Sequence, residues 1–176
     1  MYPFIRLATE TLRVRRLPPL GLFDPHVIQI RCLPWDLDPW IELNNGRTLT
    51  LYDIGRVPFV LRIGLLKALR AHGWGLTVAG ASVRYRRRVK AFHRVELRTR
   101  LLGWDSRFVY IGQTMWRNGE CTSHVLNRSA VTGKGGIVPP AEVARALGVA
   151  PESPALPGWV AAWIEADAAR PWPPAD

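Results

Sequence analysis

Hydrophobic and polar positions alternate with a period of two in five segments of the chain, a pattern typical of β-strands that bury one face. In the first segment, residues 26–33, the pattern places Ile28, Ile30 and Cys32 on one side and the residues between them on the other. Four more strands are predicted in the second half of the chain, at residues 76–85, 95–104, 108–116 and 121–132.

The segment between the first two strands has hydrophobic residues at helical spacing. Asn44 or Asn45 can cap a helix that begins near Gly46, because an Asn side chain accepts hydrogen bonds from first-turn N–H groups. Pro58 is expected to end or kink this helix, since it suits the first turn of a second one. Gly73 is expected to end the second helix.

Turn residues separate the later elements. Asn118-Gly119 predicts a type I′ hairpin turn, because both central positions of that turn need a positive φ. The glycines of residues 133–136 are expected to end the last strand, and helices are predicted over residues 1–16, 139–148 and 159–169. The small residues 79–82 are expected where a helix backbone lies close across the sheet.

One strand, a long broken helix and then four strands joined mostly by tight turns predict the α+β class, with an antiparallel sheet that the helix covers on one face. We divide the chain into a basic amphipathic segment (1–24), a central domain (25–136) and C-terminal helices with a Pro-rich tail (137–176). Because unpaired sheet edges favour association, we expect a homodimer or homotetramer.

Composition narrows the class of protein. The chain has 176 residues, of which 48% are hydrophobic, so one core is the working assumption. No segment approaches the roughly 18 apolar residues of a spanning helix, and the N-terminus lacks a secretory signal, so a cytoplasmic protein is expected. Two cysteines, Cys32 and Cys121, are too few for a disulfide framework or a thiolate zinc site.

The charge predicts an anionic partner. Lys and Arg number 24 against 14 Asp and Glu, a formal net charge of +10. Nucleic acid, an anionic membrane surface and a phosphorylated small ligand all fit this balance. The basic amphipathic residues 1–16 can contact a membrane at its periphery or dock as a helix on their own domain.

A cluster of cations lies in residues 84–94, where six of eleven positions are Lys or Arg. In a strand, Arg84, Arg86 and Arg88 would share one face and could pair with the phosphates of coenzyme A or with an RNA backbone. No signature of an RNA-binding module is present, which disfavours nucleic acid.

The residues between the first strand and the helix carry a motif. Asp36, Asp38, Asn44 and Asn45 match the Asp-x-Asp, short loop and Asn-Asn pattern of a known family, and here the sequence resembles the hot dog-fold acyl-CoA thioesterases of the 4-hydroxybenzoyl-CoA thioesterase type. It is most similar to the subset that includes thioesterase superfamily member 6. The resemblance covers residues 27–132 and implies a hot dog fold, in which the antiparallel sheet wraps around a long broken central helix.

The resemblance also implies an activity and a site. It assigns the catalytic carboxylate to Asp38, as base or nucleophile, and the polarisation of the acyl-CoA carbonyl to the backbone N–H of Asn45. Thioester hydrolysis needs such a carboxylate and such a donor, and a helix N-terminus supplies free N–H groups. We expect substrate contacts at Asn44, Gly46, Arg84, Arg86 and Arg88, and neither a metal nor a cofactor.

Two departures from the family pattern leave a second function open. Glu42 stands where many relatives have His, and Thr48 where they have Tyr. Glu42 could act as a further acid or base if the loop brings it near Asp38, because like charges raise one pKa. The alternative is a non-catalytic acyl-CoA or lipid-binding hot dog module, in which Asp36 and Asp38 only accept backbone hydrogen bonds of a turn.

Overall fold

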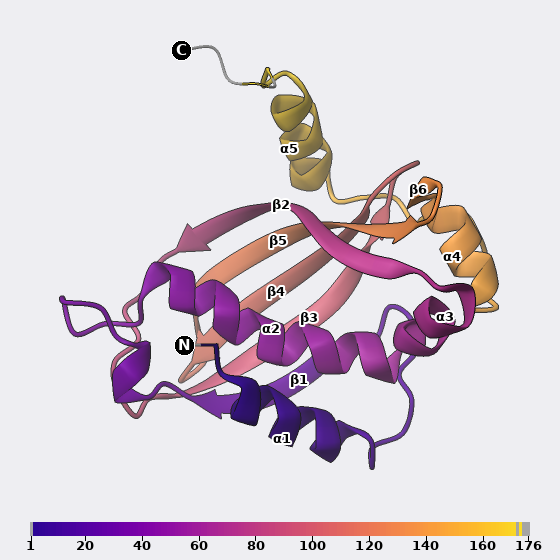
Figure 1. The fold of residues 1–176 in the computed structure, drawn as a ribbon. Helices are drawn as coiled ribbons and strands as arrows, with labels where there is room; N and C mark the ends of the chain where they lie inside the picture. The colour runs from indigo at the N-terminus through magenta and orange to yellow at the C-terminus, as the bar shows by residue number, and fades with distance from the viewer. Residues whose placement is uncertain (1, 172, 174–176) are drawn as a thin grey trace.

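The computed structural model describes residues 2–171 and 173, and its centre is a curled antiparallel sheet around the helix α2, Asn45–Arg62 (Figure 1). The strand order is β1-β3-β4-β5-β2, with β6 paired to β5. This is the hot dog arrangement that the resemblance implies. The strands are β1 (His26–Arg31), β2 (Gly75–Tyr85), β3 (Arg94–Trp104), β4 (Val109–Arg117), β5 (Glu120–Gly133) and β6 (Gly136–Val138). The other helices are α1 (Phe4–Val14), the 3-10 turn η1 (Pro34–Asp36), α3 (Leu65–His72), α4 (Pro140–Ala146) and α5 (Gly158–Ala168).

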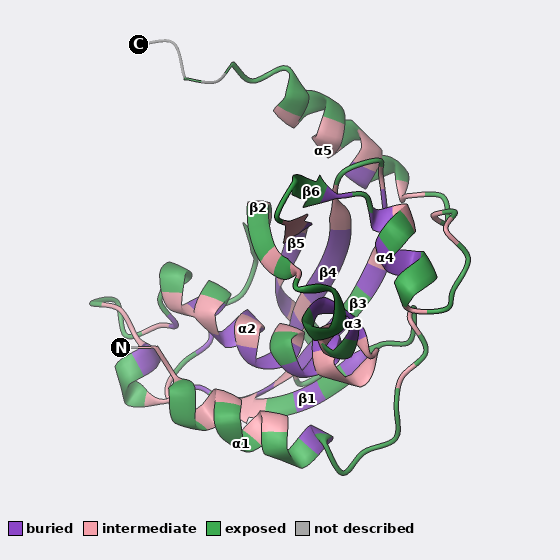
Figure 2. Ribbon diagram, turned by 45° about the vertical axis from the view of Figure 1, so that its right-hand side comes forward, coloured by how far each residue is buried: buried purple, intermediate pink, exposed green. Residues whose placement is uncertain are grey.

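The core lies between α2 and the concave face of the sheet, where Figure 2 shows buried residues on both elements. Leu97, Met115 and Val125 are fully buried there, against Leu51 and Tyr52 of α2. Burying one such side chain contributes about 1.5–3 kcal/mol, so this layer fixes how α2 lies across the strands.

Helix α2 comes close to the sheet at Gly55. A Cβ at Gly55 would lie 3.0 Å from the Oγ1 of Thr99, so a larger side chain there would require Thr99 or the helix to shift. The expectation that the small residues 79–82 mark this approach is wrong. They lie on the edge strand β2, where Gly80 instead makes room for the side chain of Arg128.

The helix break is not at Pro58. α2 continues through Pro58 to Arg62, and the break follows at Gly64, whose φ is +79°. A proline costs α2 one N–H donor, but burial of Pro58, Phe59 and Val60 holds the turn in place. Gly73, with φ of +65°, ends α3 as predicted.

The turn predictions are confirmed at Asn118 and Gly119, which have φ of +50° and +80° between β4 and β5. The glycines of residues 133–136 end β5, but they also turn the chain into the short strand β6, which the pattern did not predict. The helices predicted near residues 139–148 and 159–169 are α4 and α5.

The N-terminal helix α1 docks on its own domain. The Tyr2 hydroxyl donates to the Asp53 carboxylate of α2 at 3.1 Å, and Val14 is 1% exposed. Phe4, Ile5 and Leu12 remain on the surface, so membrane contact through residues 1–16 stays a prediction. Met1 of that segment and residues 172 and 174–176 of the Pro-rich tail lie outside the described residues. Among the residues described, no helix has the length and apolar character needed to cross a membrane.

Candidate functional site

A pocket of about 180 Å³ opens beside the N-terminus of α2. It combines one carboxylate, three guanidinium groups and hydroxyl groups with an apolar floor. Its lining residues are Glu42, Leu43, Asn45, Thr48, Tyr85, Arg86, Arg87, Arg88, Val89, Met115, Thr122 and Ser123. The structure therefore brings two of the predicted site residues from the loop and helix, Glu42 and Asn45, together with Arg86 and Arg88.

The N-terminus of α2 is capped by Asn44, as predicted. The Asn44 Oδ1 accepts from the N–H of Arg47 at 3.0 Å, and the Asn44 carbonyl accepts from the N–H of Thr48 at 2.8 Å. The cap does not use the N–H groups of Asn45 and Gly46. A helix N-terminus carries about half a positive charge, so these two amides are suited to stabilise a developing oxyanion.

The Tyr85 side chain ties this helix end to the sheet. Its hydroxyl donates to the Asn45 carbonyl at 3.1 Å, and burial raises the Tyr85 pKa, which keeps the hydroxyl protonated as a donor. The sequence alone did not predict this contact. Tyr85 lies at the end of β2, 40 residues from Asn45 in the sequence, and only the fold brings its hydroxyl to the start of α2.

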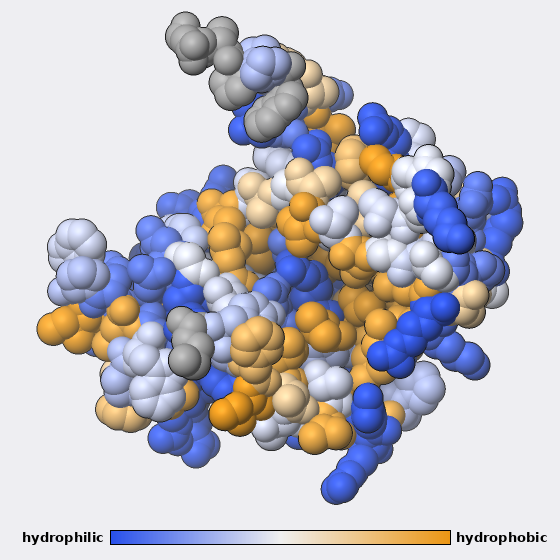
Figure 3. Space-filling view, viewed as in Figure 1, coloured by the Kyte–Doolittle hydropathy of each residue, from blue (hydrophilic) through white to orange (hydrophobic). Residues whose placement is uncertain are grey.

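Asp38 holds the loop that precedes α2. Its Oδ1 accepts from the N–H of Trp40 at 2.9 Å and lies 3.4 Å from the backbone nitrogen of Glu42, and its own N–H donates to the Glu42 carbonyl at 2.8 Å. The carboxylate of Asp38 thus sits beside a residue that lines the pocket, although Asp38 itself is not among the lining residues. In the view of Figure 3 a small hydrophobic patch lies at the left edge of the surface, where Figure 1 draws the loop before α2. Ile41 of this loop is exposed.

Glu42 enters the pocket in place of the family histidine. Its Oε2 lies 2.9 Å from the Nε of Arg88, and its side chain is partly buried. An ion pair of this kind keeps a negative charge at the pocket wall and orients Arg88 across the opening. Thr48, in place of the family tyrosine, is buried and donates its hydroxyl to the Asn44 carbonyl.

The predicted ladder of arginines on one strand face is wrong. β2 ends at Tyr85, because the N–H groups of Arg86 and Arg87 both donate to the Thr122 carbonyl, at 2.8 and 3.1 Å, and the chain then leaves the sheet. Arg86, Arg87 and Arg88 line the pocket from this loop. Arg84 lies opposite His124 on β5 and is not a lining residue of the pocket.

Asp36 has a structural environment. Its buried carboxylate pairs with Arg6 of α1 at 2.8 Å and with Arg47 of α2 at 3.2 Å, and it accepts from the N–H of Leu33 at 2.9 Å. Both aspartates of the motif therefore accept backbone bonds of a turn, and Asp36 also joins three elements. In the described part of the chain, no group of three or more potential ligand residues could hold a metal ion.

Three comparisons place this chain among known proteins. The family model described as "Thioesterase-like superfamily" matches residues 32–164. Protein THEM6 of Xenopus laevis is 32% identical over 166 residues, which cover 92% of this chain and 78% of that protein. The solved structure of the probable thioesterase YbaW from Escherichia coli has a TM-score of 0.66 at 17% identity, covering 69% of this chain and 96% of that one. A thioesterase from Thermus thermophilus, solved with coenzyme A and Zn, has a TM-score of 0.60 at 21% identity, covering 71% of this chain and 98% of that one.

Proposed function

Because the chain belongs to the thioesterase-like superfamily, we propose that it hydrolyses acyl-CoA thioesters in the pocket beside the N-terminus of α2. Family membership makes the chain a thioester hydrolase; the substrate and the residues are the proposal. The observation that carries it is the juxtaposition, in one pocket, of Asn45 at the start of α2, the Glu42 carboxylate and three arginines, with Asp38 held beside Glu42 in the preceding loop.

The thioester carbonyl is polarised at the Asn45 N–H. When a nucleophile adds to the carbonyl carbon, negative charge develops on the oxygen, and an amide fixed at a helix N-terminus stabilises that charge without reorganising. Loss of one such donor costs about 2.7–4 kcal/mol in other enzymes. The Asn44 cap and the Tyr85 hydroxyl keep the amide in position.

Asp38 acts on the thioester carbon, either by direct attack or by taking a proton from water. In the second case the hydroxide adds to the carbon, the C–S bond breaks, and the CoA thiolate takes up the proton that Asp38 removed. In the first case the attack breaks the C–S bond and forms a mixed anhydride with Asp38, which water then hydrolyses. The support is geometric: Oδ1 of Asp38 is held by the loop beside Glu42, while Oδ2 makes no hydrogen bond within the described residues. Glu42 serves as a second carboxylate that holds Arg88 at the opening.

The arginines receive the nucleotide end of the substrate. Arg86 and Arg88 are exposed at the pocket opening, and a guanidinium pairs with phosphate through two parallel hydrogen bonds. The Thermus thermophilus thioesterase, which shares this fold, was solved with coenzyme A, and this supports the assignment. The acyl group then points toward the apolar floor at Leu43, Val89 and Met115.

A thiol-release assay over acyl-CoA esters of increasing chain length and of aromatic acids tests this function. We expect turnover with at least one ester. Arg86→Gln should raise the KM for that ester about tenfold, as loss of a charged hydrogen bond does, and leave the KM for the matching N-acetylcysteamine ester unchanged. The control is Arg70→Gln, an exposed arginine of α3. Saturable acyl-CoA binding without any thiol release would instead make the chain a non-catalytic binding module.

A further inference from the structure

A second hollow lies on the face of the sheet turned away from α2. On β3, Leu97 and Leu101 are buried in the core, so the alternating residues Arg98 and Arg100 face the other side. There they border a groove of about 350 Å³ that Trp116, His124 and Trp159 also line. Its volume is within the about 300–1,000 Å³ of small-molecule sites.

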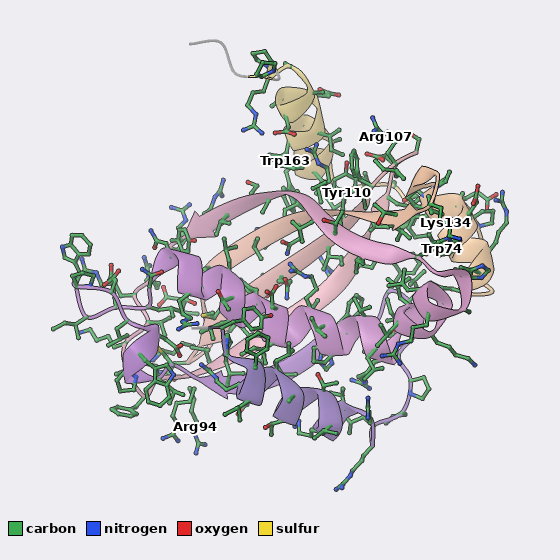
Figure 4. All side chains as sticks on the ribbon, in the orientation of Figure 1. Trp74, Arg94, Arg107, Tyr110, Lys134 and Trp163 are labelled. Carbon is green, nitrogen blue, oxygen red and sulfur yellow. The ribbon has the colours of Figure 1, made fainter. Side chains whose placement is uncertain are left out.

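Helix α5 forms one wall of this groove. Val160 and Trp163 of α5 pack on Tyr110 and Leu126, which also face away from α2, and Figure 4 labels Tyr110 and Trp163 at this contact. Trp159, the second residue of α5, lines the groove. The first turn of α5 therefore lies beside it, with no side-chain cap and no acidic residue to neutralise its positive dipole.

Arg98 and Arg100 line the groove, and a third arginine lies on the same face of the sheet. Arg84 lies directly opposite His124 and so shares this face of the sheet with Arg100. Within the described residues, neither Arg84 nor Arg100 pairs with a carboxylate, whereas Arg98 is bonded to Glu96 at 2.7 Å. Burial lowers the pKa of His124, and the positive charges of Arg84 and Arg100 lower it further.

Two indole rings accompany these cations. The Arg98 guanidinium lies 4.6 Å from the centre of the Trp116 ring, and the Trp116 Nε1 donates to Thr114 at 2.7 Å, which fixes the ring. Trp159 is 49% exposed, and its ring lies nearly perpendicular to that of His124, with 5.2 Å between the ring centres. A further hollow of about 320 Å³ shares Arg98 and Trp116 and extends the groove.

We propose that this groove is a separate site for a purine nucleoside diphosphate or triphosphate. Arg98 and Arg100, which line the groove, bind the phosphates, with Arg84 beside them on the same face, because the guanidinium fork matches phosphate oxygens; the base stacks on Trp159. The sheet separates the groove from the pocket at α2, so the nucleotide does not occupy the place of the thioester. The site is independent of the function proposed for that pocket.

Calorimetric titration of the whole chain with ADP at low ionic strength tests the site. Arg100→Gln and Trp159→Leu should each weaken ADP binding about tenfold, the effect of losing one charged hydrogen bond or one stacked base. Trp159→Phe, which keeps an aromatic face, should retain binding. Arg70→Gln, which changes an exposed arginine outside the groove, should leave ADP binding unchanged. Thermal unfolding of each variant checks that the chain is still folded.

Four results would overturn the proposal. ADP binding could be absent, or it could be lost in Arg86→Gln and kept in Arg100→Gln, which would move the nucleotide to the pocket at α2. Tripolyphosphate could bind as tightly as ADP, which would leave no role for a base. Oligoadenylate could bind more tightly with each added nucleotide, which would assign the groove to RNA.

Discussion

Asp36 shows how one side chain can determine the shape of the site's surroundings. Its carboxylate is buried between Arg6 and Arg47 and also accepts the N–H of Leu33, so it joins α1, η1 and the first turn of α2. Removing one partner of a buried ion pair leaves uncompensated charge, which costs far more than the pair itself contributes.

Asp36→Ala should therefore lower the free energy of unfolding by about 3–5 kcal/mol, because two guanidinium groups lose their counter-ion in a buried place. Urea unfolding of the variant and the parent measures this. Glu96→Gln removes the partner of Arg98 at an exposed pair and should cost less than about 1 kcal/mol. Equal losses in the two variants would show that Asp36 does not hold the three elements together.

His26 predicts a pH dependence of stability. It is 1% exposed, with its Nδ1 3.2 Å from the Arg62 guanidinium, and burial followed by the charges of Arg62 and Arg13 lowers its pKa to about 4. The unfolded chain binds this proton below about pH 6.5, before the folded chain does, so stability should fall as the pH drops from about 6.5 to 4.

The size of the effect is at most about 3 kcal/mol, which is the pKa shift converted to free energy. Urea unfolding between pH 7 and pH 4 should show this loss in the parent and a smaller loss in His26→Gln. The exposed His72 supplies the control, since His72→Gln should keep the loss of the parent. An identical pH profile in His26→Gln would contradict the assignment.

At the scale of elements, the cap of α2 links stability to activity. Asn44→Ala should lower the free energy of unfolding by about 0.5–2 kcal/mol, because the N–H of Arg47 loses its acceptor. The kcat for thioester hydrolysis should fall as well, since the neighbouring Asn45 amide is no longer fixed. Asn44→Ser keeps an acceptor at the cap and should restore both quantities; rescue of stability without kcat would separate the cap from catalysis.

Sequence patterns predict an element correctly when neighbouring residues, rather than distant contacts, determine it. Alternation identifies β1 to β5, and Asn118-Gly119 fixes its own turn through its backbone conformation. The predicted helix end at Pro58 is wrong, because packing of the residues around Pro58 offsets the cost of the proline. The helix instead breaks at Gly64, where the backbone has a positive φ. The short strand β6 is stabilised by pairing with β5 rather than by its three residues.

In the candidate site, too, the features set by neighbouring residues could be predicted, and those set by distant contacts could not. The cap at Asn44 and the turn bonds of Asp36 and Asp38 are local, and their residue types predict them. The arginine ladder fails because a distant carbonyl, that of Thr122, ends β2. The groove on the other face joins β3, β4, β5 and α5, so no single stretch of sequence could indicate it.

At the scale of the whole molecule, β2 is an open edge of the sheet. Its eleven residues pair with β5 on one side only, and Val78 is 45% exposed. A long strand with unpaired N–H and C=O groups is a template for pairing with another copy, so we expect association through β2. The opposite edge strand, β1, exposes Val27 to a similar degree, at 44%.

Light scattering after size exclusion should give at least twice the mass of one chain. Val78→Lys should shift the mass toward the monomer, because two copies of the new charge meet across the paired edges, whereas Val27→Lys should not. A monomeric parent, or dissociation by Val27→Lys alone, would place association elsewhere.

The most direct test of the central claim is the rate of thioester hydrolysis by Asp38→Asn beside Glu42→Gln, measured as kcat and KM on the best acyl-CoA ester. Asp38→Asn should lower kcat by at least about 100-fold, the usual contribution of a general base, with little change in KM. Glu42→Gln should act mainly on KM, because its partner is Arg88. Hydrolysis by Asp38→Asn at the parent rate would contradict the assignment of the reaction to this carboxylate.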